Sequence, residues 1–260
     1  GSEGSSNVVG RMDKREELPG FREALACLLL RYSSLRGAHV RAGGMQAAVH
    51  GECFDALLQE FDVKMECFAS LLNCRYARFC SAFPETDAPF GSVGGFFTFR
   101  PRSGSYEANP PFVPQVIEAM AEHMDGLLGA TPRPLMFVVV IPCKGDGCAG
   151  WSRVQGSTHT VRHLVLPQKE HGFYDGGQHT KATRYRQSSA DTSVFFLQNA
   201  AARRRWPVTD EKLRRLKDAF HSKHRQQAPA SEDGDGEAAA RAAEAGGGRT
   251  AADAAVEEEG

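Results

Sequence analysis

The tetrapeptide Asn109-Pro110-Pro111-Phe112 is the stretch of the sequence best equipped for chemistry. Asn109 has a side-chain carbonyl that accepts hydrogen bonds, and Pro110 has no N–H that would compete with its own carbonyl for a ligand. Phe112 offers a flat face on which a nucleobase can stack, a contact worth about 1–3 kcal/mol in single-strand binders. Two acceptors and an aromatic face can hold an exocyclic amine in plane and leave its lone pair free to attack. The alternative is a proline-stiffened turn that leads into a core phenylalanine.

The elements on either side of this motif decide between the two interpretations. The stretch GSYEA predicts a strand over 104–108. Residues 112–128 predict a helix, with Pro114 in its first turn and with apolar residues at helical spacing, namely Val113, Val116, Ile117, Met120 and Met124. The motif therefore follows a strand and precedes a helix, where open α/β sheets bind their ligands. This position favours the amine-binding interpretation.

The rest of the apolar pattern predicts a doubly wound α/β fold. The run PLMFVVVIP at 134–142 is uninterrupted and β-branched, which is typical of a strand covered on both faces. Further strands are expected over 63–70, 96–99, 162–167 and 193–199, and the last two would form an edge hairpin around a long polar insertion. Helices are expected over 21–35, 51–61, 74–83 and 208–220, with a loop rich in Pro and Gly over 84–95.

The two ends of the sequence differ from the body in composition. Residues 1–20 begin with a Gly/Ser-rich stretch and are expected to form a disordered linker. Residues 226–260 form an acidic, Ala/Gly-rich tail without aromatic residues, which cannot bury enough surface to offset chain entropy. We expect a helical segment over 21–61 and an α/β domain over 62–225.

The net charge of −1 hides an asymmetry between tail and body. The tail holds nine acidic and two basic residues, so the preceding residues hold 29 Lys and Arg against 23 Asp and Glu. A mildly basic body suits a polyanionic ligand, although ordinary surface charge explains it equally well.

Cysteine and histidine usage gives no metal or disulfide signal. The seven cysteines form no CxxC pair, which disfavours a disulfide framework and fits a reducing compartment. Three histidines, His163, His171 and His179, accompany Glu170 and Asp175, but their spacing does not match a two-histidine helical face, so we expect no metal. No apolar run approaches about eighteen residues, so no membrane partner is expected.

Two resemblances add to these inferences. The tetrapeptide resembles the (Asp/Asn)-Pro-Pro-aromatic motif of amino-directed methyltransferases, which methylate adenine N6 and related nitrogens. Longer stretches, ECFASLLNCRYARFCSAFPETDAPFGSVGGFF, GSYEANPPF, HLVLPQKEHGFYDGGQH and VFFLQN followed by Trp206, resemble the phosphorylated-C-terminal-domain-interacting factor family over roughly residues 22–220. This family resemblance implies a Rossmann-like class I methyltransferase sheet, with residues 21–61 as the remnant of a helical domain. It also implies S-adenosylmethionine as cofactor, the cap-proximal 2′-O-methyladenosine of messenger RNA as substrate, and a nuclear location.

The same resemblance implies roles for individual residues. The catalytic residues would be Asn109, Pro110, Pro111 and Phe112. The cofactor would contact a first strand and the loop that follows it, through Cys67, Ala69, Ser70, Asn73, Asp87, Phe90, Gly91 and Ser92.

The long insertion supplies candidates for RNA contact. Tyr174, Arg184 and Arg186 suit stacking and phosphate binding, with a solvated surface loop as the alternative. The basic run ARRRW over 202–206 reads more simply as a solvated helix end.

Two departures from the family pattern keep alternatives open. Leu71 stands where the family has proline, and Trp151 and Trp206 lie too far downstream to form a WW-type pair. Binding to phosphorylated RNA polymerase II tails is therefore implied by the family but not supported by these residues. The alternatives are an RNA- or partner-binding pseudoenzyme of the same fold, and a methyltransferase for another amino group, such as an internal adenosine.

Overall fold

The computed structural model describes residues 20–36, 46–143, 147–176 and 184–227. The described fold lies within the unit Gly1–Gln226, apart from the last residue of its final helix, Gln227. Its strands are β1 (Ala47–Ala48), β2 (Gly104–Ala108), β3 (Leu135–Pro142), β4 (Thr160–Leu166), β5 (Gly172–Asp175), β6 (Tyr185–Gln187) and β7 (Thr192–Gln198). Its helices are α1 (Phe21–Arg36), α2 (Gly51–Phe61), α3 (Pro84–Asp87), α4 (Pro114–Ala130), α5 (Ala149–Gly156), α6 (Ala200–Arg205) and α7 (Asp210–Gln227), with 3₁₀ turns η1 (Ala88–Phe90) and η2 (Phe96–Thr98).

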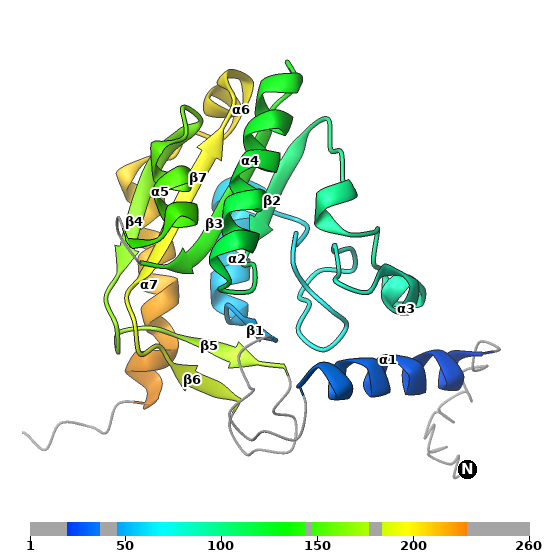
Figure 1. The fold of residues 1–260 in the computed structure, drawn as a ribbon. Helices are drawn as coiled ribbons and strands as arrows, with labels where there is room; N and C mark the ends of the chain where they lie inside the picture. Colours follow the sequence, from blue (N-terminus) through cyan, green and yellow to red (C-terminus); the bar gives the residue numbers. More distant parts are fainter. Residues whose placement is uncertain (1–19, 37–45, 144–146, 177–183, 228–260) are drawn as a thin grey trace, which may run out of the picture. The chain divides into compact units, whose positions relative to one another are not determined.

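The main sheet has the strand order β2-β3-β7-β4 (Figure 1). β2 and β3 run parallel, and β7 lies antiparallel between β3 and β4. The strands expected at 104–108, 134–142, 162–167 and 193–199 are thus confirmed, as is the antiparallel pairing of the last two at the sheet edge. Every residue of β3 is buried, as its uninterrupted apolar sequence predicts.

Three single-residue bridges extend this sheet beyond β2. Glu66 pairs in parallel with Glu107 of β2 and with Phe79, and Phe79 pairs in parallel with Ser92. The segments at Phe79 and then Ser92 are therefore added on one side of Glu66. β2 and then β3 are added on the opposite side of Glu66. This reversal is a topological switch point, beside which open α/β sheets bind ligands.

Three sequence predictions on this side of the sheet are wrong in part or in whole. The strand expected at 63–70 is reduced to the bridge at Glu66, and 74–83 is not a helix. The N–H of Cys80 donates to the carbonyl of Glu66, and the N–H of Ala69 donates to the carbonyl of Cys80, both at 2.9 Å, so these backbone groups serve neighbouring segments instead of a helix. Residues 96–98 form a 3₁₀ turn instead of a strand, because a short apolar run specifies burial without specifying conformation.

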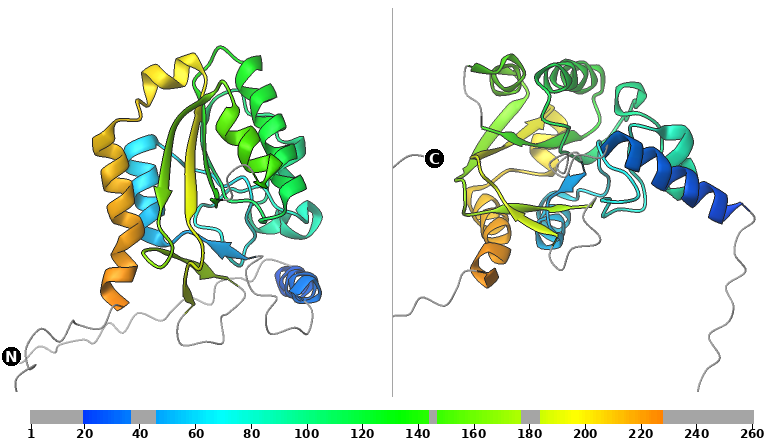
Figure 2. Two further views of the ribbon diagram at one scale, coloured as in Figure 1. Left: turned by 60° about the vertical axis from the view of Figure 1, so that its left-hand side comes forward. Right: turned by 60° about the horizontal axis from the view of Figure 1, so that its bottom comes forward.

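Helices cover both faces of the sheet (Figure 2). Alternate residues of β3 enter different clusters: Phe137 and Val139 pack with α4 and α5, whereas Val138 and Val140 pack with α2 and α7. Full burial of such side chains contributes about 1.5–3 kcal/mol each. Helices on both faces confirm that the fold is mixed α/β, and α2 covers one of these faces. No described helix is long and apolar enough to cross a membrane.

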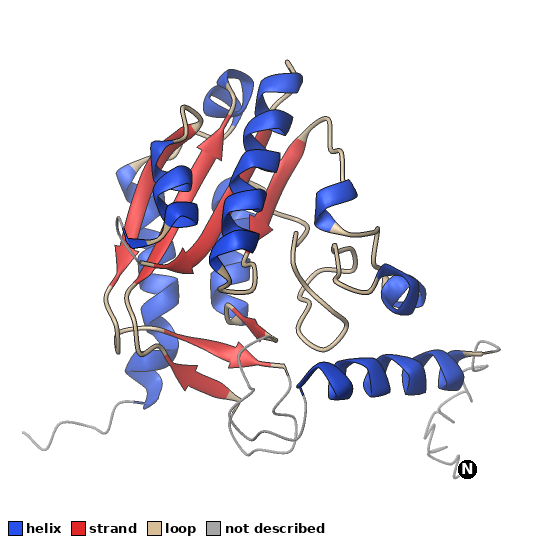
Figure 3. Cartoon of the chain, in the orientation of Figure 1, coloured by secondary structure: helices blue, strands red, loops and turns tan. Residues whose placement is uncertain are grey.

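A second, three-stranded sheet lies beside the carboxyl ends of β2 and β3 (Figures 1 and 3). Its order is β1-β5-β6 and both pairings are antiparallel. β5 and β6 come from the insertion whose sequence suggested only a polar, aromatic loop. The N–H of Gly176 donates to the carbonyl of Gln46 at 3.0 Å, and a Cβ at Gly176 would lie 2.6 Å from the carbonyl oxygen of Leu72. Only glycine allows this sheet to approach the turn at Leu72 so closely.

Two buried carboxyl groups lie side by side between β2 and the segment at Glu66. Glu66 is 2% exposed and Glu107 1%. One Glu66 oxygen accepts from the N–H groups of Arg75 and Tyr76, at 2.8 and 3.1 Å, whereas Oε1 of Glu107 has no hydrogen-bond partner among the described residues. Burial raises the pKa of Glu66 to about 7, and burial together with the Glu66 charge raises the pKa of Glu107 well above its usual value.

These raised pKa values predict how stability depends on pH. The folded chain retains these protons to higher pH than the unfolded chain, so their stabilising contribution is complete below about pH 4.5 and is lost as the pH rises through about 7. Glu107→Gln removes one titrating group, so we expect the unfolding free energy to fall less steeply between pH 5 and 8. Chemical denaturation across this range measures the effect. Glu118→Gln, on the exposed side of α4, should keep the original slope, and equal slopes for both variants would contradict the interpretation.

Candidate functional site

A cavity of about 440 Å³ opens beside the switch point, next to Cys67 and the carboxyl end of β2. Its lining contains five phenylalanines and no charged side chain among the described residues. The lining residues are Tyr32, Leu35, Gln46, Ala47, Cys67, Phe68, Ala69, Asn73, Ser81, Ala82, Phe83, Gly95, Phe96, Phe97, Thr98, Asn109, Pro110, Pro111, Phe112 and Val116. A mostly apolar pocket with a few polar groups is typical of a small-molecule site.

All four residues of the Asn-Pro-Pro-Phe motif line this cavity. Nδ2 of Asn109 donates to the carbonyl of Ala47 in β1 at 3.1 Å, which orients the amide and leaves Oδ1 as the acceptor for a ligand. The N–H of Val113 donates to the carbonyl of Pro111 at 2.7 Å. Among the described residues, no hydrogen bond is found to Oδ1 of Asn109 or to the carbonyl of Pro110, so both can accept from a ligand.

Phe112 completes the motif as an accessible aromatic face. Its side chain is 47% exposed, although the preceding residues fold into the protein. The ring makes an edge contact with Phe173 of β5, with the centroids 6.5 Å apart. This exposure excludes the alternative in which Phe112 is only a core residue.

Three of the proposed cofactor residues, Cys67, Ala69 and Asn73, also line the cavity. Oδ1 of Asn73 accepts from the N–H of Ser70 at 2.8 Å, which closes the turn after the first segment. Burial raises the pKa of the Cys67 thiol well above its usual value, so Cys67 contributes shape and not a nucleophile.

The other five are not among the residues that line the cavity. Ser70 is buried and donates to Gln46, and the hydroxyls of Ser92 and Ser81 are 2.8 Å apart. Gly91 has φ 109°, and a Cβ there would lie 2.1 Å from the carbonyl oxygen of Ala77. The ring of Phe90 contacts that of Phe21, 6.0 Å away. Direct cofactor contact by Ser70, Asp87, Phe90, Gly91 and Ser92 stays a prediction.

Asp87 is the tether that holds α1 against the cavity. Its fully buried carboxylate accepts from the hydroxyl of Tyr32 at 2.6 Å and from the N–H of Leu71 at 3.5 Å. Burial, followed by the hydrogen bond to Asp87, raises the pKa of Tyr32, and burial also raises the pKa of Asp87. A proline at position 71, as in the family pattern, could not make this bond, because proline has no N–H to donate.

Sequence reasoning missed several lining residues. Tyr32 and Leu35 come from α1, and Phe83, Phe96 and Phe97 come from segments whose conformation was predicted wrongly. The only sequence signal at Tyr32 was its helical spacing with other apolar residues. That spacing predicts that Tyr32 is buried but does not predict that it contacts a ligand.

The three proposed RNA-binding residues lie on β5, on β6 or just before β6, but they do not all line one cavity. Tyr174 and Arg184 line a second cavity of about 270 Å³, whereas Arg186 forms an ion pair with Asp175 at 3.4 Å. The basic run of α6 follows β7, whose carboxyl end pairs with the amino end of β3, so it lies at the opposite edge of the sheet from the motif.

The histidines weighed as metal ligands are dispersed. His163 stacks on Phe195 with the centroids 4.1 Å apart, and His171 contacts Thr192 at 2.7 Å and the carbonyl of Pro167 at 2.8 Å. His179 lies outside the described residues. Across the described ranges, no group of three or more potential ligands could hold a metal ion.

Comparison with known proteins decides the family. The model of the family "Phosphorylated CTD interacting factor 1 WW domain" matches residues 9–176. The chain belongs to this family. The human mRNA (2'-O-methyladenosine-N(6)-)-methyltransferase is 39% identical over 209 residues, which cover 79% of this chain and 30% of the human protein. The mouse protein of the same name is 39% identical over 204 residues, covering 77% and 29%. The chain thus spans about 30% of the length of these curated relatives.

The tether between α1 and the cavity generates a stability prediction. Tyr32→Phe removes the donor from a fully buried carboxylate, and we expect a loss of about 1.5–3 kcal/mol, as for hydrogen bonds to charged groups. Tyr76→Phe is the matched control, because the Tyr76 hydroxyl donates at 3.2 Å to the neutral carbonyl of Phe54, and it should cost only about 0.5–1.5 kcal/mol. Urea denaturation of both variants checks this difference, and equal losses would argue against the tether.

Proposed function

We propose that this chain transfers a methyl group from S-adenosylmethionine to N6 of the cap-proximal 2′-O-methyladenosine of messenger RNA. One observation carries the proposal: the Asn-Pro-Pro-Phe motif lines a cavity with no charged side chain in its described lining, where the acceptor Oδ1 of Asn109 lies in the same motif as the exposed ring of Phe112. The 39% identity to methyltransferases of this specificity supports the same reaction.

The fold supports a Rossmann-like methyltransferase domain. All pairings from Ser92 through Phe79, Glu66 and β2 to β3 are parallel. The order in which successive segments are added to the sheet reverses beside Glu66. Such sheets place ligands outside the carboxyl ends of their strands, where the cavity is found.

The cavity fits S-adenosylmethionine. Its volume lies in the range of about 300–1,000 Å³ that is common for ligand sites. Phe68, Phe83, Phe96 and Phe97 provide aromatic surface for an adenine ring, and Asn73, Ser81 and Gln46 provide polar groups. The uncharged lining suits a ligand without phosphates. When bound, this cofactor supplies an electrophilic methyl group.

The chain contributes positioning and hydrogen-bond acceptance. Oδ1 of Asn109 and the carbonyl of Pro110 would accept the two amine hydrogens of adenine, so that the nitrogen lone pair points away from both acceptors. Phe112 would stack on the base. Adenine and S-adenosylmethionine would then react as two groups held in one site and not as two molecules that meet in solution. Most of the increase in the methyl-transfer rate would arise from this positioning. The cap-proximal base is single-stranded, so no duplex needs to open.

The family description names phosphorylated CTD binding and a WW domain, and neither follows for this chain. Both tryptophans are buried beside the main sheet: Trp151 donates to Ser193 at 2.9 Å, and the carbonyl of Trp206 accepts from Gln198 at 2.7 Å. These two residues therefore present no aromatic pair to a peptide. Capped messenger RNA is the partner we propose, with the nucleus as the location, as the family implies.

Asn109→Ala tests the motif. We expect the variant to lose about 10²-fold or more in kcat while still binding S-adenosylmethionine, because the lost acceptor holds the amine and not the cofactor. Asn109→Asp keeps the acceptor oxygens and should retain more activity than the alanine variant. Methyl-transfer assays with radiolabelled cofactor, together with calorimetry of cofactor binding, measure both effects. Full activity in Asn109→Ala would refute the proposed role of this side chain.

Substrate choice is tested with capped and uncapped RNA of one sequence. The proposal expects methylation of the capped RNA at the first transcribed adenosine, located by mass spectrometry. Equal rates on both RNAs would indicate another amino group, such as that of an internal adenosine. Failure to bind the cofactor even at millimolar concentration would indicate a pseudoenzyme that binds RNA or a partner.

A further inference from the structure

A second cavity lies next to the first, on the other side of Asn73. It measures about 270 Å³ and is lined by the start of α2, the turn at 72–75 and the ends of β5 and β6. Asn73 lines both cavities, and β1 contributes Ala47 to the larger one and Ala48 to the smaller one. A ligand in the larger cavity therefore has a neighbouring hollow within reach of its substituents.

The chemistry of the two cavities differs sharply. The larger one has no charged side chain in its described lining, whereas Arg75, Arg184 and Tyr174 line the smaller one without any carboxylate among its described lining residues. Arg75 and Arg184 are exposed, so their guanidinium groups are accessible to a ligand. Two guanidinium groups beside an aromatic ring form a site for a phosphate group or for a nucleotide.

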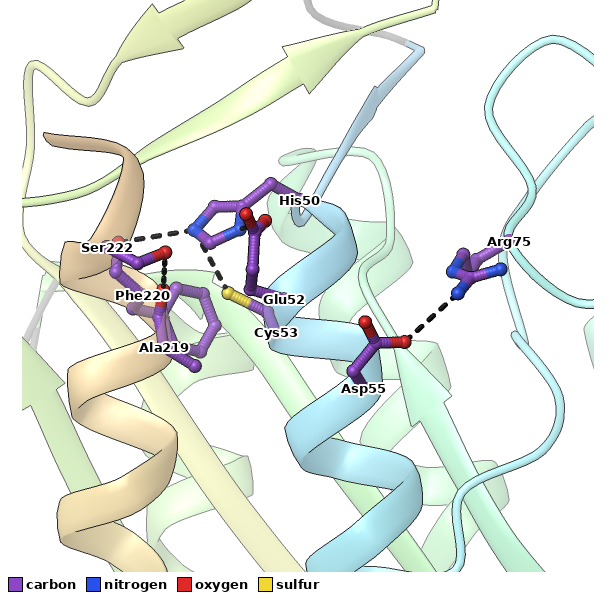
Figure 4. Close-up of polar contacts among 8 residues, drawn as sticks. All are labelled: His50, Glu52, Cys53, Asp55, Arg75, Ala219, Phe220 and Ser222. Carbon is purple, nitrogen blue, oxygen red and sulfur yellow. Dashed lines mark hydrogen bonds and ion pairs between the residues drawn. The ribbon is translucent and has the colours of Figure 1, made fainter. Parts of the chain in front are cut away.

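The wall of the smaller cavity is fixed by contacts between distant segments (Figure 4). The buried ring of His50 contacts Glu52 at 3.0 Å through Nδ1, and Cys53 and the carbonyl of Phe220, both at 3.3 Å, through Nε2. This places the start of α2 against the C-terminal part of α7. Arg75 is held over α2 by an ion pair with Asp55 at 3.0 Å.

Cys53, His50 and Glu52 contact one another as the nucleophile, base and acid of a catalytic triad do, but they do not form one. Cys53 is fully buried, and burial raises the pKa of its thiol well above its usual value. A nucleophile must be both accessible and ionised. These contacts therefore support the cavity wall and do not add a second reaction.

We propose that Arg75 and Arg184 bind a phosphate of the RNA that adjoins the target adenosine, while the adenine occupies the larger cavity at Asn109. The inference rests on the proposed function for the identity of the polymer. Its own support is the pairing of an uncharged cavity with a basic one across a single shared residue, Asn73. The phosphate belongs either to the cap triphosphate or to the first downstream phosphodiester, which share the same chemistry.

The test uses Arg75→Ala and Arg184→Ala in the full 260-residue chain. We expect each variant to raise the Kd and the KM for capped RNA about tenfold, with little change in kcat or in cofactor affinity. Each should also lower the slope of log Kd against log salt by about 0.7, which is the value for one phosphate contact on a single strand. Fluorescence anisotropy of a labelled capped oligonucleotide gives Kd directly.

Arg162→Ala is the matched control. Arg162 also forms an exposed ion pair at 3.0 Å, with Asp210, so its loss removes a comparable surface contact far from the cavity. Comparing the cap dinucleotide with a longer capped RNA identifies the phosphate: an effect on both assigns the triphosphate, and an effect on the longer RNA alone assigns the downstream phosphodiester. Unchanged affinity for both RNAs, or losses equal to that of Arg162→Ala, overturns the inference.

The two proposals fail separately in this design. If the wild type binds capped RNA through Arg75 and Arg184 but does not bind S-adenosylmethionine, the methyl-transfer proposal fails and the phosphate site stands. If the wild type methylates RNA with a KM independent of both arginines, the phosphate site fails alone. Wild-type chain that binds no capped RNA also overturns the phosphate site.

Discussion

The site depends on the backbone pairing between the segment at Glu66 and strand β2. The N–H of Cys67 donates to the carbonyl of Glu107 at 2.8 Å, and the N–H of Glu107 donates to the carbonyl of Met65 at 3.0 Å. Two hydrogen bonds thus bring the turn that contains Asn73 beside the strand that leads into Asn109. Without this register, the residues that surround the cavity would belong to separate parts of the chain. The buried carboxyl groups of Glu66 and Glu107 accompany this pairing.

The second sheet and α1 complete the site from outside the main sheet. Ala47 of β1 fixes the Asn109 amide, and β5 supplies the edge of Phe173 beside Phe112. α1 contributes Tyr32 through its bond to Asp87. An uncharged pocket results, in which a hydrogen bond to an amine is stronger than in water because solvent competes less. Arg75 and Arg184 line the neighbouring cavity instead, so the uncharged lining and the basic lining are physically separated.

Much of the fold could be predicted from local pattern. The apolar run of β3 and the helical spacing of α4 specify their conformations by themselves, since length, burial and β-branching agree there. The helix prediction for residues 74–83 was wrong. The spacing of the apolar residues there fits a helix, but neighbouring segments supply hydrogen bonds to an extended chain instead. The strands β5 and β6 were missed because their short polar and aromatic sequences show little hydrophobic alternation.

The sequence by itself determined the motif, its place between a strand and a helix, and the family to which the chain belongs. Those features are local or linear, so they can be read without knowing which segments meet. Only the tertiary structure decided that Tyr32 reaches the cavity, that Asp87 is a tether within the protein, and that Tyr174 and Arg184 share a hollow with Arg75. These contacts join residues far apart in the chain, and their geometry follows from strand register and helix packing, which no local pattern encodes.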